Sequence, residues 1–278
     1  MESLVIKPQN AVLKKYIDYF LFFKKTSDQL ISYATFPNNN LCLAIYKNNN
    51  ITYTRGSAAN YCTINPGSSR YKSRLLGFHK MPFKVEINGT LDQICILFHP
   101  AALSVFTRTP YEDLINTDQV FNLLFKDKGD FILEQLFEEE SHSFRAEKIE
   151  ELLLANLNDQ LPAKLMEAFQ LIADDRQDLS IDILAKRLSV STPTLFRIFK
   201  NNVGMNPKTY IKTLRFRNVL NEILNQQNPL TNIALANNYF DQAHFINDFK
   251  SLSGYSPSQL LDKVSIEQQN LAWIYNNK

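Results

Sequence analysis

The sequence predicts an α+β protein with a β-rich N-terminal half, a helical linker and an all-α C-terminal domain. Three observations lead to this prediction. At 278 residues the chain is longer than one ordinary domain, so two domains are expected. Short apolar runs separated by polar turns occupy about the first hundred residues. Helical patterns with an internal repeat occupy about the last hundred.

The strands of the N-terminal half are expected where apolar residues cluster between turn residues. The expected strands are 41–46, 51–53, 75–78, 84–87 and 93–98, and polar clusters separate them at 37–40, 48–50, 65–67 and 88–89. The Asn-Gly pair at 88–89 favours a positive φ angle and therefore predicts a tight hairpin. Several short strands at regular spacing predict a sandwich or a small barrel.

Helical periodicity begins after His99-Pro100 and continues through residues 101–172. The polar stretch 156–162 is the expected boundary, because Pro162 suits the first turn of a new helix that runs to about residue 173. We therefore expect a sensing or dimerisation domain with its helical linker at 1–155 and a second domain at 156–278.

The distribution of charge distinguishes the C-terminal part from the rest of the chain. Residues 179–257 carry nine Lys and Arg against four Asp and Glu, whereas residues 1–178 carry 19 against 22. A basic segment on an acidic remainder indicates a polyanionic partner. An ordinary solvated surface would produce the same asymmetry, so charge alone does not decide between the two.

Cysteine usage and the N-terminus predict the compartment. Cys42, Cys62 and Cys95 are odd in number and too far apart for a paired metal motif, which favours buried free thiols in a reducing compartment. The N-terminus lacks a signal-peptide pattern, and the apolar run 16–23 contains Asp18 and is too short to span a bilayer. We therefore expect a cytoplasmic protein without membrane contact.

A repeat of about fifty residues marks the C-terminal part. Four residues, Phe199, Lys200, Gly204 and Pro207, recur fifty positions later as Phe249, Lys250, Gly254 and Pro257. Ala185 and Ala234 are forty-nine positions apart, which predicts one extra residue in the turn of the second copy. Each copy has the pattern of a helix-turn-helix unit, in which the first helix crosses closely over the second. A small residue is needed at that crossing, and the two alanines supply it.

The first unit carries further signals of this motif. Ser189 occupies the turn position where Gly is usual, and Ser191 or Thr192 can cap the second helix. Pro193 falls in the first turn of that helix, where its missing N–H group costs nothing.

The outer face of this helix is the candidate DNA-reading surface of the first unit. Pro193, Phe196, Arg197 and Lys200 share it at helical spacing. Arginine can grip guanine or a phosphate, and phenylalanine can meet a thymine methyl group. The structural alternatives are packing of Phe196 against a neighbouring helix and a surface ion pair for Arg197.

In the second unit, the candidate DNA-reading residues are mainly polar and uncharged, whereas the first unit has Arg and Lys. Asp241 is the expected N-cap, and Asn238 occupies the turn because Asn tolerates the left-handed conformation. The candidate readers on or near the outer face are Gln242, Ala243, His244 and Asn247. Gln and Asn can each pair with adenine, whereas His244 either contacts a phosphate or caps the helix locally. Asp248 is expected to point away from DNA.

One long helix is expected to connect the two units over 210–224, because apolar residues line one face of this segment and basic residues lie near it. A helix of this length would fix the separation of the two units. Two recognition helices could then enter successive turns of the major groove, about 34 Å apart.

These residues resemble the AraC/XylS family of transcription regulators over about 179–262. The motifs that carry the resemblance are 184–185, 195–200, 204–207, 214–215, 233–234, 241–245, 249–250 and 254–257, with Ser191 and Tyr210. The family's DNA-reading positions fall on Pro193, Phe196 and Arg197, and in the second unit on Gln242, Ala243, His244 and Asn247. The chain departs from the family at Asn238-Tyr239, at Ala243 and at Asn247, where Gly-Phe, Ser and Arg are usual. The second unit therefore looks weaker electrostatically.

The resemblance implies a sequence-specific transcription factor with a cupin-like barrel as its N-terminal sensor. It also implies duplex DNA and RNA polymerase as partners, together with a small-molecule effector and a second copy of the chain. The alternative is a cupin-type enzyme with an accessory DNA-binding module. The β-rich region has only His79 and His99 and no paired His motif, so we expect no metal, no cofactor and no enzymatic activity. Interior aromatics can line a pocket, although core packing is the expected role for most of Tyr46, Tyr53, Phe78, Phe83 and Phe98.

Overall fold

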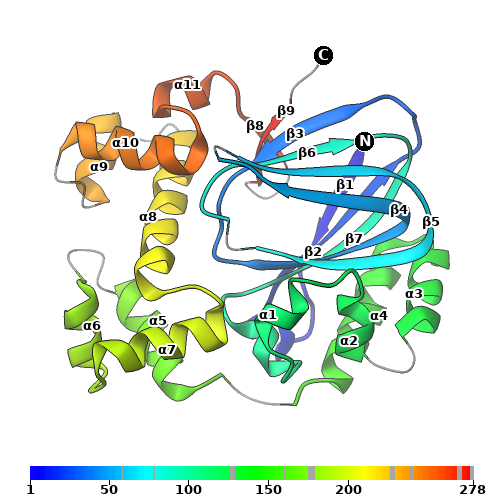
Figure 1. Cartoon of the computed structure of the whole chain (residues 1–278), viewed down its shortest axis with the longest axis horizontal. Helices are drawn as coiled ribbons and strands as arrows, with labels where there is room; N and C mark the ends of the chain where they lie inside the picture. The colour runs from blue at the N-terminus through cyan, green and yellow to red at the C-terminus, as the bar shows by residue number, and fades with distance from the viewer. Residues whose placement is uncertain are drawn as a thin grey trace.

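Figure 1 shows a computed structural model of the chain, in which a curled β-sheet lies beside a helical C-terminal region. The structure describes residues 1–57, 59–77, 79–125, 129–158, 161–174, 179–225, 229–237, 239, 241–267 and 271–275. Short helices cover one face of the sheet, and a second group of helices lies against one end of it. This arrangement confirms the predicted α+β class.

The sheet contains nine described strands in the order β1-β2-β7-β4-β5-β6-β3-β9-β8. Their bounds are β1 (Glu2–Ile6), β2 (Ile17–Lys25), β3 (Ile31–Thr35), β4 (Leu41–Arg55), β5 (Asn60–Leu76), β6 (Phe83–Ile87), β7 (Leu91–Phe98), β8 (Ser265–Glu267) and β9 (Leu271–Tyr275). The described pairings are antiparallel except that of β5 with β6, which is parallel. The sheet curls into a half-barrel.

Both faces of the central strands are buried, which explains why β2 is apolar at nearly every position. Alternate side chains of a strand point to opposite faces. Phe20 and Phe22 therefore join the core between the sheet and its covering helices. Tyr19, Leu21 and Phe23 join a second core on the concave face of the sheet.

The polar clusters at 48–50 and 65–67 bend strands and do not end them, so the predicted breaks at these positions are wrong. Asn48 has a φ of 57°, and the register shifts between Lys47 and Asn49, which is the sign of a β-bulge. Pro66 lies opposite Asn49, beside this bulge, a position in which a sheet tolerates proline. Because the two irregularities face each other, β4 and β5 form one long bent hairpin.

The tight hairpin predicted at 88–89 is also wrong, although the predicted positive φ is present. Gly89 has a φ of 76°. The strands on either side of it, β6 and β7, are not neighbours in the sheet, because β6 pairs with β3 and β5. The turn is instead tied to β5, since the Asn88 N–H donates to the Ile64 carbonyl at 2.8 Å.

The helices that follow the half-barrel cover its outer face. They are η2 (Ala102–Val105), α1 (Tyr111–Leu114), α2 (Val120–Phe125), α3 (Gly129–Glu138) and α4 (His142–Ala155), and a 3₁₀ turn η1 (Leu13–Lys15) precedes β2. Arg145 of α4 is buried and forms an ion pair with Asp92 of β7 at 3.0 Å. This contact and the apolar core hold the predicted helical linker against the sheet.

The C-terminal region contains the two predicted helix pairs. Its helices are α5 (Ala163–Asp174), α6 (Ile181–Arg187), α7 (Thr192–Val203), α8 (Pro207–Leu224), α9 (Leu230–Ala236), α10 (Gln242–Ser253) and α11 (Pro257–Leu261). Helix α5 begins directly after Pro162, as predicted. The turn between α9 and α10 is one residue longer than that between α6 and α7, as the spacing of the two alanines predicts.

Three kinds of contact join the half-barrel to the helical region. Phe36 packs in one apolar core with α8 to α11, and its ring lies 6.4 Å from that of Phe216. The Asn39 side chain donates to the Tyr210 carbonyl at 3.2 Å. Strand β9 pairs with β3 and extends the sheet at its edge.

Candidate functional site

The first helix-turn-helix unit consists of α6 and α7. Ala185 is 2% exposed where the helices cross, and the Val190 N–H donates to its carbonyl at 3.0 Å. Ser189 adopts a φ of 53°, which explains why glycine is usual at this turn. Ser191 is the N-cap of α7, and its hydroxyl accepts from the Thr194 N–H at 3.3 Å.

The predicted DNA readers of the first unit lie together on the surface of α7. All four are exposed: Pro193, Phe196, Arg197 and Lys200. Phe196 is 38% exposed, so packing against a neighbouring helix does not bury it. The Lys200 ammonium lies 3.8 Å from a carboxylate oxygen of Glu112, but both side chains are more than 70% exposed. An exposed ion pair of this kind contributes little to the stability of the folded chain.

The second unit, α9 and α10, repeats this geometry. Ala234 is 4% exposed at the crossing, and the Tyr239 N–H donates to its carbonyl at 3.1 Å. Asp241 caps α10 as predicted, since its carboxylate accepts from the His244 N–H at 2.6 Å. The predicted turn residue, Asn238, lies outside the described residues.

The predicted readers of the second unit also lie together, and all are exposed: Gln242, Ala243, His244 and Asn247. The His244 ring packs edge-on against Tyr239, with centroids 5.4 Å apart. The Asp248 carboxylate pairs with Lys212 of α8 at 2.7 Å. This pair turns the acidic side chain toward α8 and neutralises it.

Helix α8 fixes the two units to each other. Each recognition helix ends at a glycine with positive φ, 80° at Gly204 and 77° at Gly254. Tyr210, near the start of α8, belongs to the apolar core of the first unit. Phe216 and Ile223, further along, belong to the core of the second unit. Since one helix contributes to both cores, the recognition helices are held in a fixed relation.

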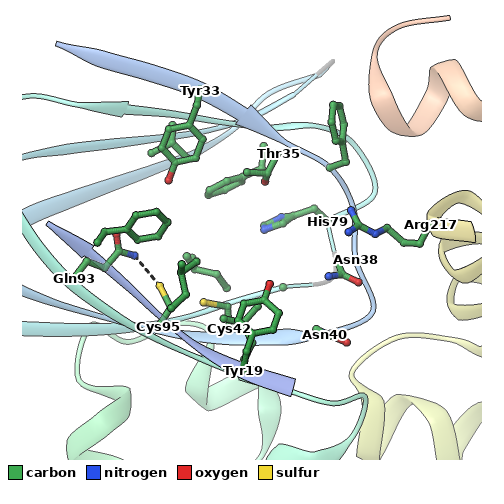
Figure 2. Close-up of a pocket in the computed structure, with 18 residues that line it drawn as sticks. Tyr19, Tyr33, Thr35, Asn38, Asn40, Cys42, His79, Gln93, Cys95 and Arg217 are labelled. Atoms are coloured by element: carbon green, nitrogen blue, oxygen red, sulfur yellow. Dashed lines mark hydrogen bonds between the residues drawn. The ribbon is translucent and has the colours of Figure 1, made fainter. Parts of the chain in front are cut away.

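A pocket lies between the concave face of the half-barrel and α8 (Figure 2). Its volume is about 170 Å³. Its walls are mainly apolar and include Leu21, Phe23, Val85 and Leu97. We call it the half-barrel pocket.

The half-barrel pocket has a cationic end. Arg217 of α8 points toward it beside Asn38 and His79 (Figure 2). Burial lowers the pKa of Arg217, and Tyr19 and Asp18 act in the opposite direction. Asp18 is already bound by Lys7 at 2.7 Å and by the Asn40 amide at 2.6 Å. The arginine therefore brings a positive charge to the pocket with little compensation from the described residues.

A hydrogen-bond acceptor that no described residue pairs with lies on another wall of the half-barrel pocket. The Gln93 amide nitrogen donates to the Cys95 sulfur at 3.1 Å (Figure 2). The Gln93 carbonyl oxygen is buried and has no hydrogen-bond partner among the described residues. Leaving such an oxygen unpaired costs about 1–3 kcal/mol, so a hydrogen-bond donor in the pocket would be favoured there.

His79 is neutral in this environment. Burial lowers its pKa to about 4, and Arg55 acts in the same direction. Its ring stacks on Phe83 with centroids 4.5 Å apart. The Asn60 amide nitrogen lies 3.3 Å from His79 Nδ1, where an unprotonated ring nitrogen accepts a hydrogen bond.

The sequence predicted the candidate reading residues, which the structure places on exposed helix faces, but it did not predict the half-barrel pocket. Of the aromatics considered for a pocket, Phe83 lines it, Tyr53 lines a smaller neighbouring cavity, and Tyr46 and Phe98 are buried in the core. Phe78 lies outside the described residues. Arg217 and Gln93 were not singled out, because the residues of the pocket come from segments far apart in the chain.

The described residues offer neither a metal-binding cluster nor a helix that could span a membrane. No group of three or more His, Cys, Asp or Glu side chains in the described part of the chain could hold a metal ion. No described helix is both long enough and apolar enough to cross a membrane.

Two protein families match parts of this chain. Residues 184–263 match a family described as a helix-turn-helix domain, and residues 5–120 match a domain of unknown function (DUF6597). The first match spans α7, α8 and α10. It therefore includes all eight predicted DNA readers.

The curated relatives are named as transcription regulators. An HTH-type transcriptional regulator of Haemophilus influenzae is 29% identical over 45% of this chain and 41% of its own length. The activator RhaS of Yersinia pseudotuberculosis is 27% identical over 44% and 52%. The XylDLEGF operon transcriptional activator of Pseudomonas putida is 26% identical over 44% and 40%. The chain thus spans about half or less of the length of these relatives.

Solved structures that are similar to this chain include the C-terminal domain of AraT from Geobacillus stearothermophilus. It is 26% identical, covers 40% of this chain and 93% of its own length, and has a TM-score of 0.37. ToxT from Vibrio cholerae is 12% identical, covers 87% of this chain and 97% of its own length, and has a TM-score of 0.43.

Proposed function

We propose that this chain is a sequence-specific transcription factor that reads two successive major-groove segments of duplex DNA, since residues 184–263 match a helix-turn-helix family and a relative is named as a transcriptional activator. One observation carries the proposal: two capped recognition helices expose their reading faces, and α8 contributes to the cores of both units. Rigidly spaced helices of this kind suit grooves one helical turn apart.

The eight exposed residues take different parts in this reading. Arg197 and Lys200 supply charge to guanine or phosphate, and Phe196 supplies an apolar contact for a thymine methyl group. Gln242 and Asn247 supply amides for adenine. Pro193, Ala243 and His244 shape the surface that meets the groove. RNA polymerase and a second copy of the chain are the further partners that we propose.

Selection from a pool of random duplexes, followed by footprinting of the full chain, tests this function. We expect two protected major-groove segments whose centres are about 10 base pairs apart. A single protected segment would contradict the bipartite reading. Failure to select any sequence at low salt would contradict the function itself.

The half-barrel pocket supports control of this activity by a small ligand. Its cationic end at Arg217 suits a carboxylate, its apolar walls suit a hydrocarbon or aromatic body, and the Gln93 carbonyl suits a hydrogen-bond donor on that body. Arg217 belongs to α8, which holds the two units. A ligand that binds this arginine therefore contacts the helix that sets their relation.

Thermal unfolding with a panel of small carboxylic acids and their matching primary amides tests the ligand site. We expect an acid to raise the Tm of the wild-type chain, because a ligand that binds only the folded state stabilises it. Its amide should have a smaller effect, and Arg217→Met should remove the difference between the two. A difference that persists in Arg217→Met would place the anion elsewhere.

A further inference from the structure

A second cleft lies between the half-barrel and the first recognition helix. Its volume is about 590 Å³. Lys80, in the connection between β5 and β6, lines one side. The other side is formed by the exposed face and the end of α7 and by the start of α8, including Phe196, Arg197 and Lys200. The N-terminal half therefore places a lysine beside the proposed DNA readers.

The cleft is cationic. Three of its lining residues, Lys80, Arg197 and Lys200, are basic, and none is acidic. Lys80 is exposed, and no described carboxylate forms an ion pair with it within 4.0 Å. Glu112 forms an ion pair with Lys200 at 3.8 Å, and both side chains are open to solvent. A cluster of this kind favours an anion.

The segment that carries Lys80 is held between the two helix-turn-helix units. Pro82 is buried, and its carbonyl accepts from the Asn60 N–H at 2.8 Å. A methyl group built on Gly254, at the end of α10, would lie 3.3 Å from Pro82 Cγ. The segment 79–82 thus faces α7 at Lys80 and the end of α10 at Pro82.

A protein that reads two successive major-groove segments also faces the phosphate backbones that run between them. Side chains in that position bind phosphate, which orients the protein on the duplex without reading its sequence. We propose that Lys80 binds a DNA phosphate beside the first recognition helix, so that the N-terminal half takes part directly in DNA binding. This inference rests on the proposed function.

Salt titration of DNA binding by the full chain tests the inference. The dissociation constant is measured by fluorescence anisotropy on the selected duplex between about 50 and 200 mM salt. Loss of one phosphate contact reduces the steepness of the plot of log association constant against log salt concentration by about 0.9. Across this range, the affinity of such a variant therefore falls about threefold less than that of the wild type. Lys80→Gln should show this loss, and Lys80→Arg should keep the wild-type slope. The matched control is Lys148→Gln, at an exposed lysine of α4.

A second readout separates a phosphate contact from a base contact. Lys80→Gln should weaken binding to the selected duplex and to scrambled duplexes by the same factor, because a phosphate carries no sequence information. An unchanged salt slope in Lys80→Gln would overturn the inference. Tighter DNA binding by this variant would also overturn it, because it would mean that the segment 79–82 obstructs the duplex. A wild-type chain that binds no duplex would instead refute the proposed function.

Discussion

At the scale of single residues, the two recognition helices differ in the charge that they offer to DNA. Arg197 on α7 and Asn247 on α10 occupy corresponding exposed positions. Asp248, the acid that follows Asn247, is neutralised by Lys212. The second unit is therefore less basic than the first but carries no strong repulsion toward phosphate.

We expect Arg197→Ala to weaken specific binding more than Asn247→Ala. Arginine brings a full charge and a fork that can take guanine, and a good bidentate contact discriminates by about 1–3 kcal/mol. Anisotropy titrations of both variants on the selected duplex measure the difference. Equal losses, or a larger loss at Asn247, would show that the second unit is the main reader.

His79 makes stability depend on pH. An unfolded histidine takes up a proton near pH 6.5, whereas burial lowers the pKa of His79 to about 4 in the folded chain. Between these values the unfolded state binds more protons, so the free energy of unfolding decreases as the pH falls. The contribution is fully present above about pH 6.5 and is lost toward pH 4.

We therefore expect His79→Gln to lose less stability than the wild type between pH 6.5 and pH 4.5. Denaturant unfolding at both pH values measures this, and the difference between the two proteins cancels the titration of carboxylates that they share. Parallel losses in the two proteins would mean that His79 takes up its proton normally in the folded state.

At the scale of elements, the helix crossings determine whether each unit can present its recognition helix. Ala185 and Ala234 are almost fully buried, and each belongs to the apolar core of its own unit. A larger side chain has no room there, and a buried carboxylate without a partner costs several kcal/mol.

We expect Ala185→Glu and Ala234→Glu each to disable their own unit, so that each shortens or abolishes the footprint. Alanine to serine at the same positions is the matched control, since it adds little volume. Ala234→Glu with an unchanged footprint, beside Ala185→Glu that abolishes binding, would mean that only the first unit reads DNA.

The helical elements were predictable from sequence because their signals are local. Ser191, one of the two candidates, caps α7, Asp241 caps α10 as predicted, and Pro162 directly precedes α5. The strands were predicted less well. Gly89 has the expected positive φ, and Asn48 lies in one of the predicted polar breaks, but a local conformation does not decide whether a strand ends, bends or crosses to another neighbour. Pairing with distant strands decides that.

At the scale of the whole molecule, the proposed reading surface lies in the C-terminal region, and the proposed phosphate contact of Lys80 comes from the other half. We expect residues 160–278 alone to bind duplex DNA, with an affinity that falls steeply as salt increases. The fragment lacks Lys80, so its salt slope should be lower than that of the full chain. Anisotropy on the selected duplex measures both, and a folded fragment that binds no duplex at low salt would contradict this expectation.

The parts of the site that sequence missed are those that only the complete fold assembles. The predicted reading residues follow one another along two helices, so helical periodicity places those of each helix on one face. Arg217 reaches a pocket formed by the distant half-barrel, and Lys80 meets α7 from a connection between strands. His79 lines the half-barrel pocket, and Lys80, the next residue, lines the cationic cleft. No local sequence pattern predicts contacts between segments that are so far apart in the chain.

The pairing of β9 with β3 has a consequence for synthesis on the ribosome. In the sheet Ala34 pairs with Ile274, and this partner is translated 240 residues after Ala34. At about 5–20 residues per second, this delay lasts roughly 10 to 50 seconds. During that time β3 presents an open edge of the kind that pairs with other nascent chains. The half-barrel therefore completes its sheet only after both helix-turn-helix units have been synthesised.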